Sequence, residues 1–147
     1  MSEIDKAFQF PVGMTWKDKV QFIAYEFAKY PQVEMPLKHH FAPGVYMREI
    51  FMPAGSIVIG KIHRTEHFNI IQKGKVTLYD EHGSTTLEAP VTFVSKAGVQ
   101  KLLYIHEDCV WSTVHVTDST DVPTLERDLV EVMPELFPET KSIEKQP

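Results

Sequence analysis

Histidine is the residue type whose number and spacing in this chain could support chemistry. The chain contains seven: His39, His40, His63, His67, His82, His106 and His115. Histidine is the commonest metal ligand in proteins, and its charge changes near neutral pH. A cluster of histidines would predict a metal site or a polar ligand pocket, whereas scattered histidines would be ordinary polar residues.

His63 and His67 have the most informative spacing. On a straight strand four residues span about 13 Å, too far for two bonds of about 2.1 Å to the same metal ion. The pair can therefore share a site only if residues 64–66 bend, and the apolar pattern is interrupted there, between Ile62 and Phe68. We expect such a bend to bring both imidazoles together inside one end of the fold. The alternative is that both are ordinary polar residues of a loop.

The other histidines differ in what their positions allow. His82 lies in an expected turn and should be solvated, and His39 and His40 precede an expected loop, where at most one of the two can face a given pocket. His106 and His115 lie in the last two expected strands. Either could supply a third ligand, but the sequence does not fix the direction of its side chain.

Hydrophobic periodicity predicts the elements that would position these residues. A capping Thr15 and an apolar face ended by Pro31 predict an amphipathic helix over residues 16–30. Seven or eight short strands with turn residues between them predict a β-sandwich or barrel over residues 44–116. A capping Asp121 and the stripe Leu125, Leu129 and Val132 predict a short second helix.

Composition limits the function classes. A chain of 147 residues is the usual size of one domain, which we divide into an N-terminal arm and helix (1–43), a barrel (44–116) and a C-terminal helix and tail (117–147). The net charge of −5, without clustered Lys and Arg, argues against nucleic acid as a partner. No segment has the length and apolar character of a membrane span or of a secretory signal. With a single cysteine, these features predict a cytoplasmic protein.

The stretch GSIVIGKIHRTEHFNIIQKG, residues 55–74, resembles the first sequence motif of the cupin superfamily. That motif has a Gly, a His-x-His pair, an acidic residue and a later Gly. His63 and Gly74 match the first histidine and the closing glycine. Thr65 stands at the second histidine, and His67 stands where the family usually has Glu. In the second cupin motif, the turn at residues 98–100 matches, and Lys101 occupies the place of a metal-ligating histidine.

This resemblance implies a mainly β protein: a single cupin-type, jelly-roll β-barrel with an N-terminal amphipathic helix and a short C-terminal helix. Residues 31–130 more widely resemble small cupin-like proteins of tailed-phage genomes. That likeness implies a location in the host cytoplasm or the virion and a phage or host protein as partner.

The residues leave three readings open, a metal-using barrel, a metal-free ligand pocket and a non-catalytic interaction protein, and no catalytic residue is assigned in any of them. The favoured one is a non-catalytic binding or interaction protein with a pocket for a small ligand, contacted by His63, Arg64, His67, Lys101 and His115. The alternative is a metal-dependent enzyme acting on a small molecule. Its divalent transition metal would be held by His63, His67 and His106, with His115 or a carboxylate as other possible third ligands. Lys101 in a ligand position favours a pocket without metal.

We also expect a homodimer. Four large apolar residues lie in the irregular terminal segments: Phe8, Phe10, Leu136 and Phe137. Burying one such side chain contributes roughly 1.5–3 kcal/mol. These residues should therefore either fold back on their own barrel or cover the barrel of a second copy, and closed two-fold dimers are the commonest homo-oligomers.

Overall fold

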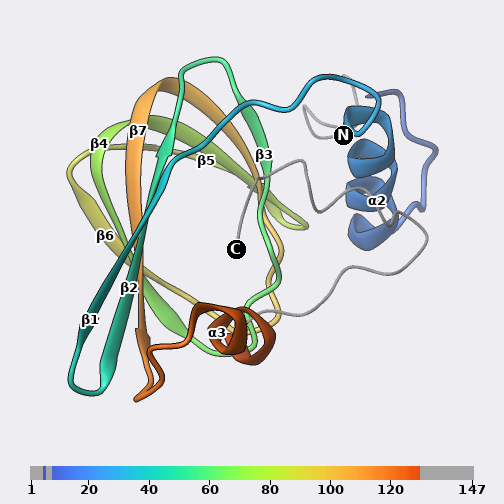
Figure 1. The fold of residues 1–147 in the computed structure, drawn as a ribbon. Coiled ribbons are helices and arrows are strands. Elements are labelled where there is room, and N and C mark those ends of the chain that lie inside the picture. Colours follow the sequence, from blue (N-terminus) through green and yellow to red (C-terminus); the bar gives the residue numbers. More distant parts are fainter. Residues whose placement is uncertain (1–4, 6–7, 130–147) are drawn as a thin grey trace.

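An antiparallel sheet curls into a barrel, with one helix outside it and another at one end (Figure 1). The structure is a computed structural model and describes Asp5 and residues 8–129. The strands are β1 (Leu37–Ala42), β2 (Val45–Met52), β3 (Ile57–Ile59), β4 (His67–Asp80), β5 (Gly83–Glu88), β6 (Val91–Ser95) and β7 (Leu102–Val116), and the helices are α2 (Trp16–Phe27) and α3 (Val122–Leu129). The prediction of a mainly β fold with an early helix and a short late helix is confirmed.

The strands differ from the sequence prediction in two respects. Residues 37–42, expected to belong to the arm and a loop, form strand β1 and pair with β2. Strands β4 and β7 are each one continuous strand, whereas the sequence predicted two shorter strands in place of each. The pairing of β4 with β7 shifts register between Ile71 and Val76, so bulges let two long strands bend together where the sequence pattern suggested breaks.

Helix α2 forms as its sequence predicts and covers the outside of the barrel. The Thr15 hydroxyl accepts a hydrogen bond of 3.1 Å from the Asp18 N–H, which satisfies one of the free donors of the first turn. The buried face of the helix packs against Phe10, Ile59 and Leu102. No helix among the described residues combines the length and apolar character needed to cross a membrane.

The N-terminal aromatic residues fold back on their own chain. Phe8 and Phe10 stack with ring centroids 5.6 Å apart and pack on the cluster around α2. Of the two alternatives that the sequence left for these residues, the structure therefore shows the first. Leu136, Phe137 and Val132 lie outside the described residues.

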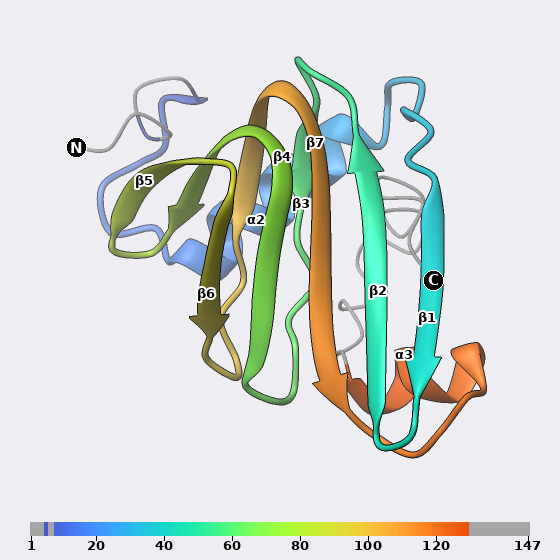
Figure 2. The same cartoon turned by 90° about the vertical axis from the view of Figure 1, so that its left-hand side faces the viewer.

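The register of the central strands sets the order of side chains inside the barrel. Figure 2 shows β2, β7 and β4 side by side, and residues that face each other across such strands point to the same side of the sheet. The inward-facing side chains form three layers. The outermost layer contains Tyr46 paired with His115 and His67 paired with Ser95. The second layer contains Arg48, Thr113 and Asn69, and the third contains Ile50, Trp111 and Ile71. The barrel is thus polar at one end and apolar beneath it.

Gly74 tests the close approach of β4 and β7. Its φ is +105°, and a Cβ at this position would lie 2.5 Å from the Asp108 carbonyl oxygen and 2.8 Å from the Cys109 Cα. We expect Gly74→Ala to lower the free energy of unfolding by at least about 2 kcal/mol, because backbone strain and overlap add. Urea denaturation measures this.

Gly55→Ala is the matched control for that measurement. Gly55 has a φ of +85° but nothing within 4 Å of an added Cβ, so it retains the backbone strain without the overlap. If both variants lost the same free energy of unfolding, the contact between β4 and β7 would not require glycine.

Candidate functional site

Three histidine side chains converge at the polar end of the barrel. The ring centroids of His63 and His67 are 4.2 Å apart, those of His67 and His115 are 4.8 Å apart, and those of His63 and His115 are 5.3 Å apart. One ring nitrogen from each lies within 4.8 Å of the other two. The expectation that His63 and His67 come together is therefore confirmed.

Two of the three histidines are placed by strand pairing. Phe68 faces Val114 across β4 and β7, so the preceding His67 and the following His115 meet at the end of the same pair of strands. Both histidines are buried. The His67–His115 pair therefore requires no loop geometry, only the antiparallel register.

His63 reaches the pair through the bend that its spacing required. The chain bends at Arg64 and Thr65, and backbone hydrogen bonds fix both sides of the bend. The Gly98 N–H donates to the His63 carbonyl at 2.9 Å, and the Arg64 N–H donates to the Leu129 carbonyl at 2.7 Å. The second bond ties the bend to the end of α3.

Burial keeps the three imidazoles neutral. Loss of solvation, followed by the neighbouring His67 and His115 and then by the Arg48 and Lys101 charges, lowers the pKa of His63 to about 2. Burial likewise lowers the pKa of His115 to about 4, and it lowers the pKa of His67. Neutral imidazole is the form that coordinates metal, so at neutral pH these side chains are ready to bind one.

The described residues fit a metal ion, because each histidine has a nitrogen available. The His67 Nδ1 lies 3.1 Å from the Thr65 carbonyl, which can only accept, so Nδ1 carries the proton and Nε2 has its lone pair free. The Nδ1 atoms of His63 and His115 are buried and have no hydrogen-bond partner among the described residues. Around a metal with bonds of about 2.1 Å, neighbouring ligand atoms are about 3.0–3.4 Å apart.

A pocket extends from His63 and His67 into the barrel, and His115, predicted to contact its ligand, does not line it. Its polar lining residues are Arg48, Lys61, His63, His67, Asn69, Ser95, Lys101 and Thr113, and its larger apolar lining residues are Ile50, Met52, Val58, Val99, Leu103 and Trp111. Its lining contains three cationic side chains and no Asp or Glu. A smaller cavity on the other side of His63, closed by α3, is lined by His115, Arg48, Lys61 and Glu126.

The structure separates the other residues predicted for the site. Lys101 lines the pocket beside His63 and His67. The side chain of His106 instead bonds the Thr77 hydroxyl at 2.6 Å and is exposed on the outside of β7. His106 directly follows Ile105, which packs in the barrel core, so its side chain lies on the opposite, outer face of β7. The third histidine of the cluster is His115, and assigning His106 to it was wrong. Arg64 is exposed and lines neither cavity.

Sequence reasoning missed Arg48 and Lys61. Arg48 lies on β2 opposite Thr113, and its inward direction could have been inferred from its even spacing with the apolar Ile50 and Met52. Lys61 belongs to the short segment between β3 and the bend, where no periodic pattern applies.

Comparison with known proteins identifies the fold. No protein-family model and no curated protein matches the chain. Among solved structures, a cupin superfamily protein from Desulfitobacterium hafniense is 9% identical with a TM-score of 0.50, over 60% of this chain and 83% of that chain. A Neisseria meningitidis protein is 11% identical with a TM-score of 0.50, over 63% of this chain and 93% of that one. A cupin-2 domain protein from Shewanella frigidimarina is 15% identical with a TM-score of 0.48, over 63% and 89%.

The fold is that of the cupins. The predicted cupin-type barrel is thereby confirmed. At these identities the likeness concerns the fold, so the chemistry of this cupin barrel has to be argued from its own residues.

The buried histidines predict a pH-dependent stability in metal-free protein. Their folded-state pKa values lie below the ordinary 6.5, so below pH 6.5 the unfolded chain binds protons that the folded protein does not, and stability falls as pH falls. Each such histidine costs about 1.4 kcal/mol at pH 5.5 relative to pH 7.5. We expect urea denaturation in EDTA to show a loss of about 3 kcal/mol from His63 and His115 together.

His115→Gln should remove about half of that loss. His82→Gln, at a side chain that is 85% exposed, is the control and should leave it unchanged. A wild-type stability that is the same at both pH values would contradict the neutral state of the cluster.

Proposed function

We propose that this protein binds a small molecule in its barrel pocket with the help of a divalent transition metal held by His63, His67 and His115. The observation that carries the proposal is the convergence of three neutral ring nitrogens within 4.8 Å. Buried imidazole nitrogens with unused lone pairs are costly unless something satisfies them. A metal ion does so, and three imidazoles suit zinc, iron, copper or nickel.

The protein's own residues would divide the work. The three imidazoles would hold the ion at the mouth of the pocket, and the apolar residues beneath would exclude water from the ligand. Because three protein ligands leave coordination positions open, a ligand in the pocket could reach the metal directly. We favour a binding role, as the sequence analysis did.

A metal-dependent enzyme is the second candidate. The open coordination positions favour it, since a bound metal can polarise a substrate oxygen or activate water. The described residues that line the pocket include no carboxylate, so any proton transfer in this reaction would fall to a histidine or to Lys101. Turnover of a small molecule by metal-loaded protein would decide for this candidate.

Metal analysis tests the proposal. We expect protein purified without an affinity tag and dialysed against zinc to retain one ion per chain. His67→Ala and His115→Ala should each weaken zinc binding at least tenfold, because each removes one of three ligands. Competition with a chromophoric chelator measures the affinity.

His106→Ala is the control for zinc binding, because His106 is on the outside of the barrel and should leave the affinity unchanged. Wild-type protein that retains no zinc would overturn the proposal. Affinity that survives both the His67 and the His115 substitution would place the metal elsewhere.

Phage association stays a prediction. It is supported by the resemblance of residues 31–130 to small cupin-like proteins of tailed-phage genomes. A host-cytoplasmic or virion location, and a phage or host protein as partner, would follow from it.

We further propose a homodimer through the outer face of the sheet. Phe68 faces Val94 across β4 and β6 and Val114 across β4 and β7, so these side chains share the outer face with Val116. Phe68 is 55%, Val94 49% and Val116 91% exposed. An exposed apolar surface of this kind fits a second copy of itself better than a charged partner.

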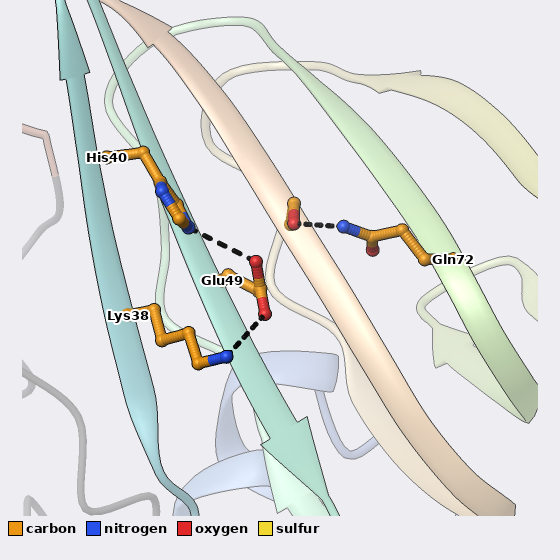
Figure 3. Close-up of polar contacts among 5 residues, drawn as sticks. Lys38, His40, Glu49 and Gln72 are labelled. Carbon is orange, nitrogen blue, oxygen red and sulfur yellow. Dashed lines mark hydrogen bonds and ion pairs between the residues drawn. The ribbon is translucent and has the colours of Figure 1, made fainter.

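The other half of that face is polar, which bounds the proposed contact. Glu49 pairs with His40 at 3.2 Å and with Lys38 at 3.9 Å, and the Gln72 amide bonds the Ser112 hydroxyl at 2.7 Å (Figure 3). These groups satisfy one another and would form the rim of an interface centred on Phe68.

Light scattering at micromolar concentration tests the dimer. We expect wild-type protein to be dimeric and Phe68→Glu to be monomeric, because the substitution buries a charge without a partner in the interface. Tyr30→Glu, at a side chain that is 65% exposed near α2, should stay dimeric. A monomeric wild-type protein refutes the dimer, and a dimeric Phe68→Glu variant refutes this interface.

A further inference from the structure

We propose that the ligand of the pocket is a small organic acid, whose carboxylate lies between Lys101 and Arg48 and whose apolar part extends toward Trp111. This inference rests on the proposed function, because it names the class of molecule that the same site takes. It is carried by three independent features: the charge of the pocket lining, its hydrogen-bonding inventory and its division into polar and apolar layers.

Charge is the first feature. Lys101 and Arg48 line the same pocket as His63 from different segments, Arg48 from β2 and Lys101 from the residue before β7, and both charges act on the His63 ring. Lys61 adds a third cation, and no acidic residue lines the main pocket. Glu126 faces Arg48 and Lys61 only from the smaller cavity behind His63, so it does not line the space beside Lys101. A metal at the histidines would add further positive charge, which a bound anion would neutralise.

Hydrogen bonding is the second feature. Ser95 Oγ accepts from the Lys101 ammonium and, at 2.7 Å, from the Asn69 amide. With both of its lone pairs used, the Ser95 hydroxyl has only a donor left. The Asn69 oxygen accepts from the Trp111 indole N–H at 3.0 Å, which uses one of its two lone pairs. Lysine and arginine are donors only. With the histidine lone pairs directed at the metal, the groups left at the polar end of the pocket are mainly donors, which match a ligand made of acceptors, as a carboxylate is.

The layering of the barrel is the third feature, and it selects an organic acid over an inorganic anion. Immediately beneath the layer of Arg48 and Asn69 comes the layer of Ile50 and Trp111. Met52 and Val58 also line the pocket at this apolar end. Inorganic phosphate would fill the polar layer and leave the apolar wall unused. A carboxylate on a short hydrocarbon or aromatic body uses both.

Calorimetry on zinc-loaded protein tests the inference with three probes: benzoate, benzyl alcohol and inorganic phosphate. Benzyl alcohol keeps the shape of benzoate without its charge, and phosphate keeps a charge without the apolar body. We expect benzoate to bind at least tenfold more tightly than either. If phosphate binds as tightly as benzoate, the apolar wall is not used and the inference is overturned. If benzyl alcohol binds as tightly, the cations do not select an anion and it is equally overturned.

Substitutions then locate the carboxylate. Lys101→Met should weaken benzoate binding at least tenfold while one zinc ion per chain is retained. Lys96→Met is the control, since Lys96 pairs with Glu66 on the surface and its side chain is 81% exposed. Benzoate binding unchanged in Lys101→Met would overturn the inference. Arg48→Met is measured in parallel, so that poor folding of one variant leaves the other as the test.

The two proposals fail in different ways. Wild-type protein that binds no zinc overturns the proposed function. Wild-type protein that binds zinc but no benzoate overturns the organic-acid inference alone and leaves the metal site in place.

Discussion

The antiparallel register between β4 and β7 is the constraint on which the rest of the molecule depends. These two long strands lie at the centre of the sheet, and the pairing of Phe68 with Val114 decides which side chains enter the barrel. A slip of one residue would turn His67, Asn69 and Ile71 outward and bring Phe68 and Ile70 in. The apolar third layer fixes this register, because burying Ile71 and Trp111 is favourable only with the present alternation.

The site is thus held by the core beneath it. Hydrogen bonds connect the layers. The Trp111 indole N–H donates to the Asn69 oxygen, and the Asn69 amide N–H donates to the Ser95 hydroxyl oxygen. These bonds fix the rotamers of groups beside the histidines, and a ligand would find its donors already oriented. The same arrangement has an energetic cost, since cations and neutral histidines are taken out of water together. We interpret that cost as what a metal and an anionic ligand would relieve.

Lys101 is the position at which this chain departs most from the metal-ligand set that the cupin resemblance implies. A cation at the place of a metal-ligating histidine argues against a metal in the usual position, and the sequence alone favoured a pocket without one. In the structure His115 supplies a third histidine from β7, and the Lys101 ammonium is turned to Ser95. A histidine cluster that could hold a metal and a half-buried cation therefore coexist, with Lys101 beside the cluster in the pocket.

Local pattern in the sequence was enough for the mainly β fold, the helix over α2, the bend after His63 and the meeting of His63 with His67. Each of these follows from interactions between residues close in the chain, such as the cap at Thr15 or the reach of four residues between two ligands. The choice between His106 and His115 depended on which face of β7 turns inward, and only the pairing of β7 with β2 and β4 settled it. Arg48 entered the site for the same reason, and Lys61 through the course of a segment without periodicity. Side-chain direction in a barrel is set by partners far away in sequence, so it was the tertiary structure that decided which histidines and cations share the pocket.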